Sequence, residues 1–261
     1  MSKQLSSLFL SAAVLLSQIA FASDLEKEKR WAEQVVDSLM DGEEHYLNDG
    51  KNNFLSLVTE NSDGDTPYGA VVIHGTGVHP NWPTVVQPLR VGLTEEGWHT
   101  IAIQMPVLAN EATHDDYTVV FPEVPARIDA AVKHLKEEMG VKRVVLIAHS
   151  LGSSMTAYHL SQNKPAVDGF VAVGMGGGGE SPERNTLEQL KKIDIPMLDL
   201  AGSEDLESVM KSSAARKESQ SHNAAYQQIV EKGADHFFEG EEEALLNHVT
   251  NWLTKQKTSW Q

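Results

Sequence analysis

The chain of 261 residues contains no cysteine. It can therefore form no disulfide bond, and its N-terminus cannot be anchored through a lipid-modified cysteine. With 41% hydrophobic and 22% charged residues, it has enough apolar material for one sizeable core. We expect a single domain that depends on this core for its stability.

Positive charge is scarce as well. The sequence has 21 lysine and arginine residues against 37 aspartate and glutamate residues, which gives a formal charge of −16. Such a charge repels phosphate backbones and anionic membrane surfaces, and no basic stripe offsets it. We therefore expect no nucleic-acid partner.

A long uninterrupted apolar run is also missing. The N-terminal run from Leu8 to Ala20 is broken by polar residues and is too short to span a bilayer. It follows Lys3 and leads into Ala20-Phe21-Ala22, which has the small-x-small form of a signal-peptide cleavage site. We predict a secretory signal peptide over residues 1–22, a mature domain over residues 23–261 without an integral membrane anchor, and export to the periplasm.

What is present is an alternation of strand and helix patterns. Phe54–Thr59 alternates as an early strand does, and further strand patterns occur at Gly69–His74, Trp98–Gln104, Val144–Ile147, Phe170–Val173, Met197–Leu200 and Tyr226–Val230. The continuous runs at Gly69–His74 and Trp98–Gln104 are typical of strands that are covered on both faces. Amphipathic helix patterns occur at Leu25–Met40, Glu123–Met139 and Gly240–Lys255. This order predicts a three-layer, doubly wound α/β domain whose mostly parallel sheet has helices on both faces.

The segment after the Val144–Ile147 strand has the pattern of a nucleophile elbow. Ala148-His149-Ser150-Leu151-Gly152 places a serine on a sharp turn from a strand into a helix, where its hydroxyl is accessible. Ser150 is the candidate nucleophile, and the backbone N–H of Leu151 is a candidate oxyanion donor. The alternative is that Ser150 only caps the following helix. Ala148 departs from the G-x-S-x-G pattern by one methyl group.

A serine nucleophile needs a base, and two loops that follow strands supply candidates in the order Ser, Asp, His. Asp205 follows the Met197–Leu200 strand, and His236 follows the Tyr226–Val230 strand. We predict that Asp205 orients His236, which takes the proton from Ser150. The adjacent Glu204 could replace Asp205, Asp205 could merely cap a helix, and His236 could be an ordinary surface residue.

A second oxyanion donor is expected in the loop His74-Gly75-Thr76-Gly77, just past an early strand. Its glycines allow backbone N–H groups to approach a tetrahedral intermediate closely. We favour the Thr76 N–H, with Gly77 as the near alternative because the sequence does not fix the register of the loop. An ordinary glycine-rich turn is the other interpretation.

Together these residues resemble the α/β-hydrolase superfamily from about Phe54 to Lys255. The resemblance extends to a poorly characterised branch of exported bacterial proteins, and it is carried by His74–Pro83, Gly97-Trp98, Ile103–Pro106 and Phe121–Glu123. It implies the α/β-hydrolase fold and a Ser-His-Asp triad, and it supplies no substrate. Ala148 is the main departure from the superfamily's elbow sequence. This departure bears on catalytic turnover and not on the fold.

The sequence says little about the substrate. Only residues 174–196 connect two late strands where many relatives insert a large lid, so we expect a small or absent lid and an open site. His79 and Trp82 are candidate substrate-binding residues, although Trp82 could equally be a buried anchor. The acidic loop around His114 matches no established metal-ligand spacing, so we predict no metal and no cofactor.

These features predict a serine hydrolase that cleaves an ester or related acyl bond through an acyl-enzyme. A small or lipid-like carboxylester is the expected substrate, and thioesterase or peptidase activity would use the same residues. The alternative from another class is a catalytically silent binding module of the cell envelope. The sequence makes no prediction about oligomeric state.

Overall fold

The computed structural model describes residues 23–162 and 166–260. The predicted signal peptide, residues 1–22, lies outside the described residues. In chain order the helices are α1 (Leu25–Asp37), α2 (Val86–Gly92), η1 (Leu93–Glu96), η2 (Asp116–Glu123), α3 (Val124–Glu137), α4 (Leu151–Gln162), α5 (Thr186–Leu190), α6 (Glu207–Ser219) and α7 (Glu242–Ser259). The strands are β1 (Glu43–Asn48), β2 (Asn53–Thr59), β3 (Tyr68–Ile73), β4 (His99–Ile103), β5 (Arg143–His149), β6 (Gly169–Val173), β7 (Met197–Glu204) and β8 (Tyr226–Asp235).

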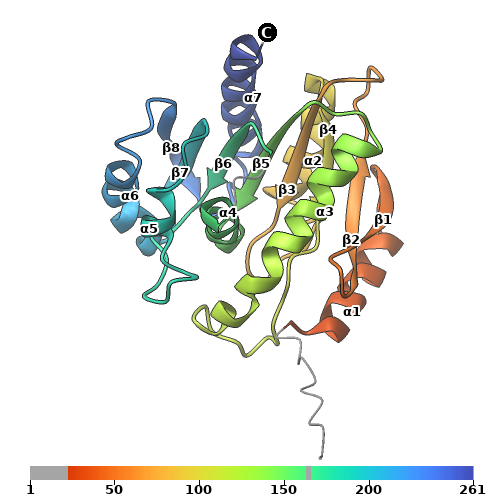
Figure 1. Cartoon of the computed structure of the whole chain (residues 1–261), viewed down its shortest axis with the longest axis horizontal. Coiled ribbons are helices and arrows are strands. Elements are labelled where there is room, and N and C mark those ends of the chain that lie inside the picture. The colour runs from red at the N-terminus through yellow and green to blue at the C-terminus, as the bar shows by residue number, and fades with distance from the viewer. Residues whose placement is uncertain (1–22, 163–165, 261) are drawn as a thin grey trace, which may run out of the picture.

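The strands form one sheet in the order β1-β2-β4-β3-β5-β6-β7-β8 (Figure 1). The strands from β4 to β8 along this order are parallel to their neighbours, whereas β1 and β2 pair as an antiparallel hairpin and β2 pairs antiparallel with β4. The predicted fold class, a mostly parallel doubly wound sheet, is confirmed.

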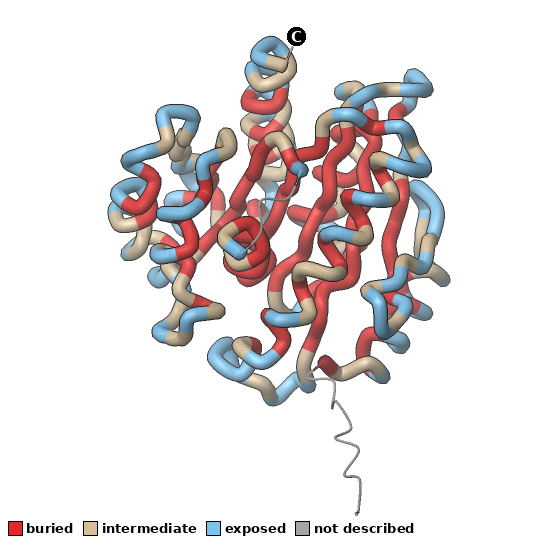
Figure 2. Tube along the Cα trace, viewed as in Figure 1, coloured by how far each residue is buried: buried red, intermediate tan, exposed pale blue. Residues whose placement is uncertain are grey.

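Helices cover both faces of this sheet and bury an apolar core on each side (Figures 1 and 2). On one face, strand side chains such as Val71 and Leu146 pack against α3, α4 and α5. On the other face, side chains such as Val72 and Ile147 pack against α1, α2 and α7. Successive strand residues point to opposite faces, and this alternation explains why the continuous apolar runs of the sequence fill two cores at once.

The sequence patterns did not predict β1. Its residues include two glutamates, a histidine and an asparagine, and they alternate between exposed and half-buried positions at the edge of the sheet. Because an edge strand buries little surface, it needs no apolar run, and polar residues there also discourage pairing with another chain. A pattern search for buried strands therefore passes over it.

The chain reverses its direction of winding at β3. This strand lies between β4 and β5, so β4 continues the sheet to one side and β5 to the other. In open α/β sheets, such a reversal leaves a crevice at the carboxyl ends of the central strands, where ligands bind. The loop after β3 and the turn after β5 meet at this point.

Candidate active site

Ser150 occupies a strained turn between β5 and α4. Its φ angle is +54°, a left-handed conformation that non-glycine residues seldom adopt. The turn is held by a hydrogen bond of 2.8 Å from the Ser150 N–H to the Val173 carbonyl oxygen at the end of β6. A Cβ on Gly152 would lie 2.4 Å from the His74 carbonyl oxygen, so only glycine fits there. These contacts hold the half-buried Ser150 side chain directly after the carboxyl end of β5.

The three predicted triad residues form one chain of hydrogen bonds. His236 Nε2 lies 2.9 Å from Ser150 Oγ. On the other side of the ring, His236 Nδ1 lies 2.6 Å from Asp205 Oδ1. The Asp205 side chain is fully buried and that of His236 is 10% exposed. A serine hydroxyl, an imidazole and a buried carboxylate therefore lie in series within hydrogen-bond reach.

The structure distinguishes Asp205 from its neighbour Glu204. Glu204 is exposed and is the last residue of β7, whereas Asp205 Oδ1 accepts hydrogen bonds from His236 and from the Leu206 N–H at 2.7 Å. The helix-cap interpretation of Asp205 does not hold, because the N-cap of α6 is Leu206 and has no side-chain cap bond. Asp205, not Glu204, contacts the imidazole.

The position of His236 is fixed through the turn that carries it. His149 Nε2 lies 2.9 Å from the His236 carbonyl oxygen, which can only accept, so Nε2 carries the proton. Asp235 Oδ1 accepts the Phe237 N–H at 2.9 Å and so tightens the same turn. The interpretation of His149 as a packing and hydrogen-bonding residue agrees with these contacts.

Burial keeps the His149 ring neutral. The ring is 2% exposed, and burial together with the nearby His236 lowers the pKa of His149 to about 4. The ordinary pKa of histidine in an unfolded chain is about 6.5. Between these two values the unfolded chain binds a proton at His149 that the folded protein does not bind. The free energy of unfolding must therefore decrease as the pH falls through this range.

His149→Gln is expected to weaken this pH dependence. A glutamine can donate to the His236 carbonyl oxygen from a similar position, but it does not titrate. The slope of the unfolding free energy between pH 6.5 and pH 5 should decrease by about 1 kcal/mol per pH unit relative to the wild type. Urea unfolding at several pH values in this range measures the slope. An unchanged slope would show that His149 is protonated equally in both states.

The predicted oxyanion loop packs directly against Ser150. A Cβ on Gly75 would lie 2.8 Å from Ser150 Cβ, so the backbone of the loop approaches the nucleophile as closely as a glycine allows. Thr76 follows half-buried, and Gly77 is exposed with a φ of +76°. Leu151 is the first, buried residue of α4. Gly75 and Ser150 therefore pack against each other, and the two candidate donors, Thr76 and Leu151, each directly follow one of them in the sequence. Gly77 is one residue further along the loop and is more exposed than Thr76.

A row of half-buried aromatic rings leads away from the triad. The Phe237 ring lies 5.2 Å from His236 between centroids, and Trp82 lies 6.4 Å from Phe237. His79 lies 5.4 Å from Trp82 and 6.1 Å from Trp31 of α1. Trp82 also packs against the core. Its contacts are therefore compatible both with a buried anchor and with a residue that lines the site. Phe237 was not predicted; its position directly after the candidate base is the signal that could have identified it.

Gly174 is a further site residue that sequence reasoning missed. A Cβ there would lie 3.0 Å from His236 Nδ1 and 3.4 Å from Asp205 Oδ2, and its φ is +60°. A side chain at this position would press on the His236 imidazole and make it shift by a few tenths of an ångström, and the positive φ would strain any residue other than glycine. The signal was available, because a glycine directly follows the strand next to the elbow strand.

The described residues meet neither the requirements of a metal site nor those of a membrane-spanning helix. No group of three or more histidine, aspartate and glutamate side chains among them is arranged to hold a metal. None of the helices in residues 23–162 and 166–260 has the length and apolar character needed to span a bilayer. Between β6 and β7, the short helix α5 is the only helix, so no large lid domain covers the site.

The fold is that of the α/β hydrolases. Est1E from Butyrivibrio proteoclasticus is similar with a TM-score of 0.67 at 13% identity, over 82% of this chain and 99% of that chain. A dienelactone hydrolase from Anabaena variabilis has a TM-score of 0.65 at 17% identity, over 83% and 99% of the two chains. A serine hydrolase without a lid from Xanthomonas campestris has a TM-score of 0.63 at 14% identity, over 83% and 95%. The resemblance to this superfamily is confirmed at the level of the fold.

The chain belongs to the family described as a protein of unknown function (DUF3530), whose model matches residues 17–118 and 118–255. No curated protein matches the sequence. The family description names no reaction.

Proposed function

We propose that the protein is a serine hydrolase that cleaves carboxylesters through an acyl-enzyme on Ser150. The observation that carries this proposal is the hydrogen-bond chain from Ser150 through His236 to the buried Asp205. A scaffold that only binds a partner has no need for a strained serine at the end of such a chain. The strain, the buried carboxylate and the imidazole are together the arrangement of an activated nucleophile.

In the first half of the reaction, Ser150 Oγ attacks the carbonyl carbon of the ester while His236 Nε2 takes the hydroxyl proton. The Asp205 carboxylate accepts the Nδ1–H of the imidazole and stabilises the imidazolium that forms. His236 then gives the proton to the leaving alcohol as the bond to carbon breaks. Ser150 is left as an ester of the acyl group.

In the second half, a water molecule takes the place of the alcohol. His236 removes one of its protons as the water oxygen attacks the acyl carbon, and the proton returns to Ser150 Oγ when the acid leaves. In both halves the carbonyl oxygen gains negative charge. We assign the backbone N–H groups of Leu151 and Thr76 to this oxyanion, with Gly77 as the alternative to Thr76.

We propose a small or lipid-like carboxylester as the substrate. The half-buried rings of Phe237, Trp82 and His79 offer an apolar surface that begins beside the catalytic imidazole. The absence of a large lid among the described residues leaves this surface accessible to substrates of varied length. We also propose that the mature domain acts in the periplasm after export. This proposal is supported by the signal-peptide pattern at the N-terminus of the sequence.

A series of p-nitrophenyl esters from acetate to decanoate tests the proposal on the mature protein. We expect turnover well above the rate in buffer, with a rapid burst of nitrophenol when deacylation is slower than acylation. Thioesters and peptide anilides with the same acyl groups separate the related activities. Well-folded protein that turns over none of these compounds would contradict the proposal and would favour the silent binding module.

A further inference from the structure

The hydrogen bonds around His74 show which ring nitrogen carries the proton. The side chain directly follows β3 and is 1% exposed. Its Nε2 accepts the backbone N–H of Met105 at 2.9 Å, and the Gln104 Nε2 group lies 3.1 Å away. A nitrogen that accepts an N–H has no proton of its own. The proton of a neutral His74 ring must therefore be on Nδ1.

The Nδ1 atom of this ring lies 2.8 Å from the Gly75 carbonyl oxygen. Since a carbonyl oxygen can only accept, Nδ1–H donates to it. Burial lowers the pKa of His74 to about 3, so the ring stays neutral and keeps this arrangement at any pH near neutrality. The imidazole thus joins the end of β4 to the first peptide of the oxyanion loop.

The Gly75 carbonyl belongs to the same peptide group as the Thr76 N–H. The described residues contain no cis peptide bond, and in a trans peptide the C=O and N–H point in opposite directions. A hydrogen bond that draws the Gly75 carbonyl toward His74 therefore turns the Thr76 N–H away from that ring. Gly75 itself touches Ser150, since a Cβ on it would lie 3.4 Å from Ser150 Oγ.

We propose that His74 is a positioning residue for the reaction at Ser150. Its Nδ1–H holds the Gly75 carbonyl, and this contact keeps the Thr76 N–H directed at the oxyanion. The inference rests on the proposed serine hydrolase function and adds a residue that touches neither the substrate nor the triad. Preorganised donors are effective because they need no reorientation when charge develops on the substrate.

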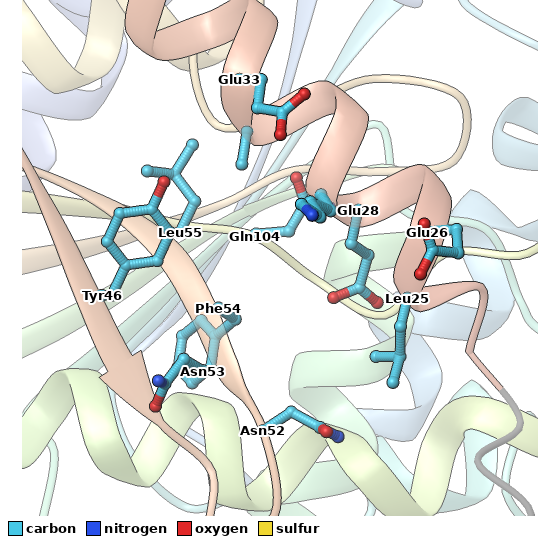
Figure 3. Close-up of a pocket in the computed structure, with 12 residues that line it drawn as sticks. Leu25, Glu26, Glu28, Glu33, Tyr46, Asn52, Asn53, Phe54, Leu55 and Gln104 are labelled. Carbon is cyan, nitrogen blue, oxygen red and sulfur yellow. The ribbon is translucent and has the colours of Figure 1, made fainter.

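The environment of His74 is built to hold the ring still. Gln104 Nε2 also donates to the Met105 carbonyl oxygen at 2.8 Å, and Arg127 Nη1 donates to the Gln104 carbonyl oxygen at 3.0 Å. Arg127 forms a buried ion pair of 2.9 Å with Glu28 of α1. Gln104 and Glu28 line a pocket of about 400 Å³ between α1 and the β1–β2 hairpin, and Figure 3 shows both side chains in its wall. A chain of buried polar contacts therefore runs from α1 to the oxyanion loop.

Two amide variants, each of which reproduces the position of one ring nitrogen, separate the two hydrogen bonds of His74. His74→Asn can place an amide N–H where Nδ1–H lies and so can still donate to Gly75, but it does not reach Met105. His74→Gln can place its Oε1 near the position of Nε2 and so can still accept from Met105, but it does not donate to Gly75. The two variants remove the same ring and leave similar cavities, so each controls for the other.

We expect His74→Gln to lower kcat for p-nitrophenyl acetate by roughly 10- to 100-fold with KM within about threefold, because an oxyanion donor acts on the transition state. His74→Asn should lose about fivefold or less. A boronic acid, which imitates the tetrahedral state on Ser150, should lose affinity in His74→Gln by a similar factor. Equal kcat in the two variants, at melting temperatures within a few degrees of each other, would overturn the proposal while leaving the hydrolase function intact.

The ring itself can be examined without a variant or any activity. In the wild-type protein labelled with ¹⁵N, long-range proton–nitrogen correlations report which nitrogen of an assigned histidine is protonated. We expect a neutral His74 with the proton on Nδ1. A proton on Nε2 would overturn the proposal even if both variants failed to fold. Absence of ester turnover in the wild type, with the Nδ1–H form observed, would instead contradict the proposed function.

Discussion

Ser150→Ala is expected to lower kcat/KM for p-nitrophenyl esters by at least about 10⁴-fold, to the level that binding and the oxyanion donors alone provide. Without Oγ there is no atom to attack the ester or to carry the acyl group. The folded state should change little, because alanine meets the same backbone strain at a φ of +54° and only the hydrogen bond to His236 is lost. We expect a change in Tm of at most about 4 °C.

Ser161→Ala is the matched control for this variant. Ser161 lies near the end of the same helix, α4, and its Oγ donates to the Tyr158 carbonyl oxygen at 2.8 Å. The substitution removes one comparable hydrogen bond at the opposite end of α4 from the elbow, so kcat/KM should stay within about twofold of the wild type. Equal losses in Ser150→Ala and Ser161→Ala would mean that the assay follows stability and not chemistry.

Asp205→Asn is expected to lower kcat by about 10³- to 10⁴-fold. The neutral amide retains the size of the carboxylate and can still accept the Leu206 N–H, but it cannot stabilise an imidazolium at His236. The Ser150 hydroxyl is then left beside a base that gains little by taking its proton. Initial rates at saturating substrate measure the loss, and circular dichroism checks that the fold is retained.

Glu204→Gln is the control for the identity of the triad acid. Glu204 is adjacent in sequence and carries the same charge, but it is exposed and does not contact His236. We expect kcat within about twofold of the wild type. A larger loss in Glu204→Gln than in Asp205→Asn would assign the acid to Glu204 and would contradict a catalytic role for the Asp205–His236 contact.

The fold and the order of the candidate residues could be predicted because the signals are local. Val144–Ile147 is apolar because β5 is buried on both faces, and the small residues after it mark a turn with no room for larger side chains. Asp205 and His236 each follow a recognisable strand, and parallel strands end at one edge of the sheet. The topology then brings these distant residues together.

The sequence favours Asp205 as the triad acid but leaves Glu204 open as the alternative, because the choice between them depends on how β7 ends. The pairing of β7 with β8 shifts between Gly202 and Glu204, and a Cβ on Gly202 would lie 2.0 Å from the Ala234 carbonyl oxygen. Such a bulge changes which face of the strand each later side chain uses. The sequence of either strand alone does not predict the geometry of this contact between the two strands.

The role of His74 was hidden for a related reason. In the sequence it is a histidine after an apolar strand and before a glycine, a position compatible with ordinary packing. Its partner atoms lie on Met105 and Gln104, which become neighbours only when β4 pairs with β3. Long-range backbone pairing decides the tautomer of the ring, and so the direction of the peptide that follows it.

Covalent trapping of Ser150 shows directly whether this serine is an activated nucleophile. A fluorophosphonate should react with the purified mature protein once per chain, and mass spectrometry of its peptides should place the phosphonyl group on Ser150. Ser150→Ala should remain unlabelled, and Asp205→Asn should react far more slowly than the wild type. Labelling of Ser150→Ala at the wild-type rate, or a folded wild-type protein that takes up no label, would contradict the claim that Ser150 is an activated nucleophile.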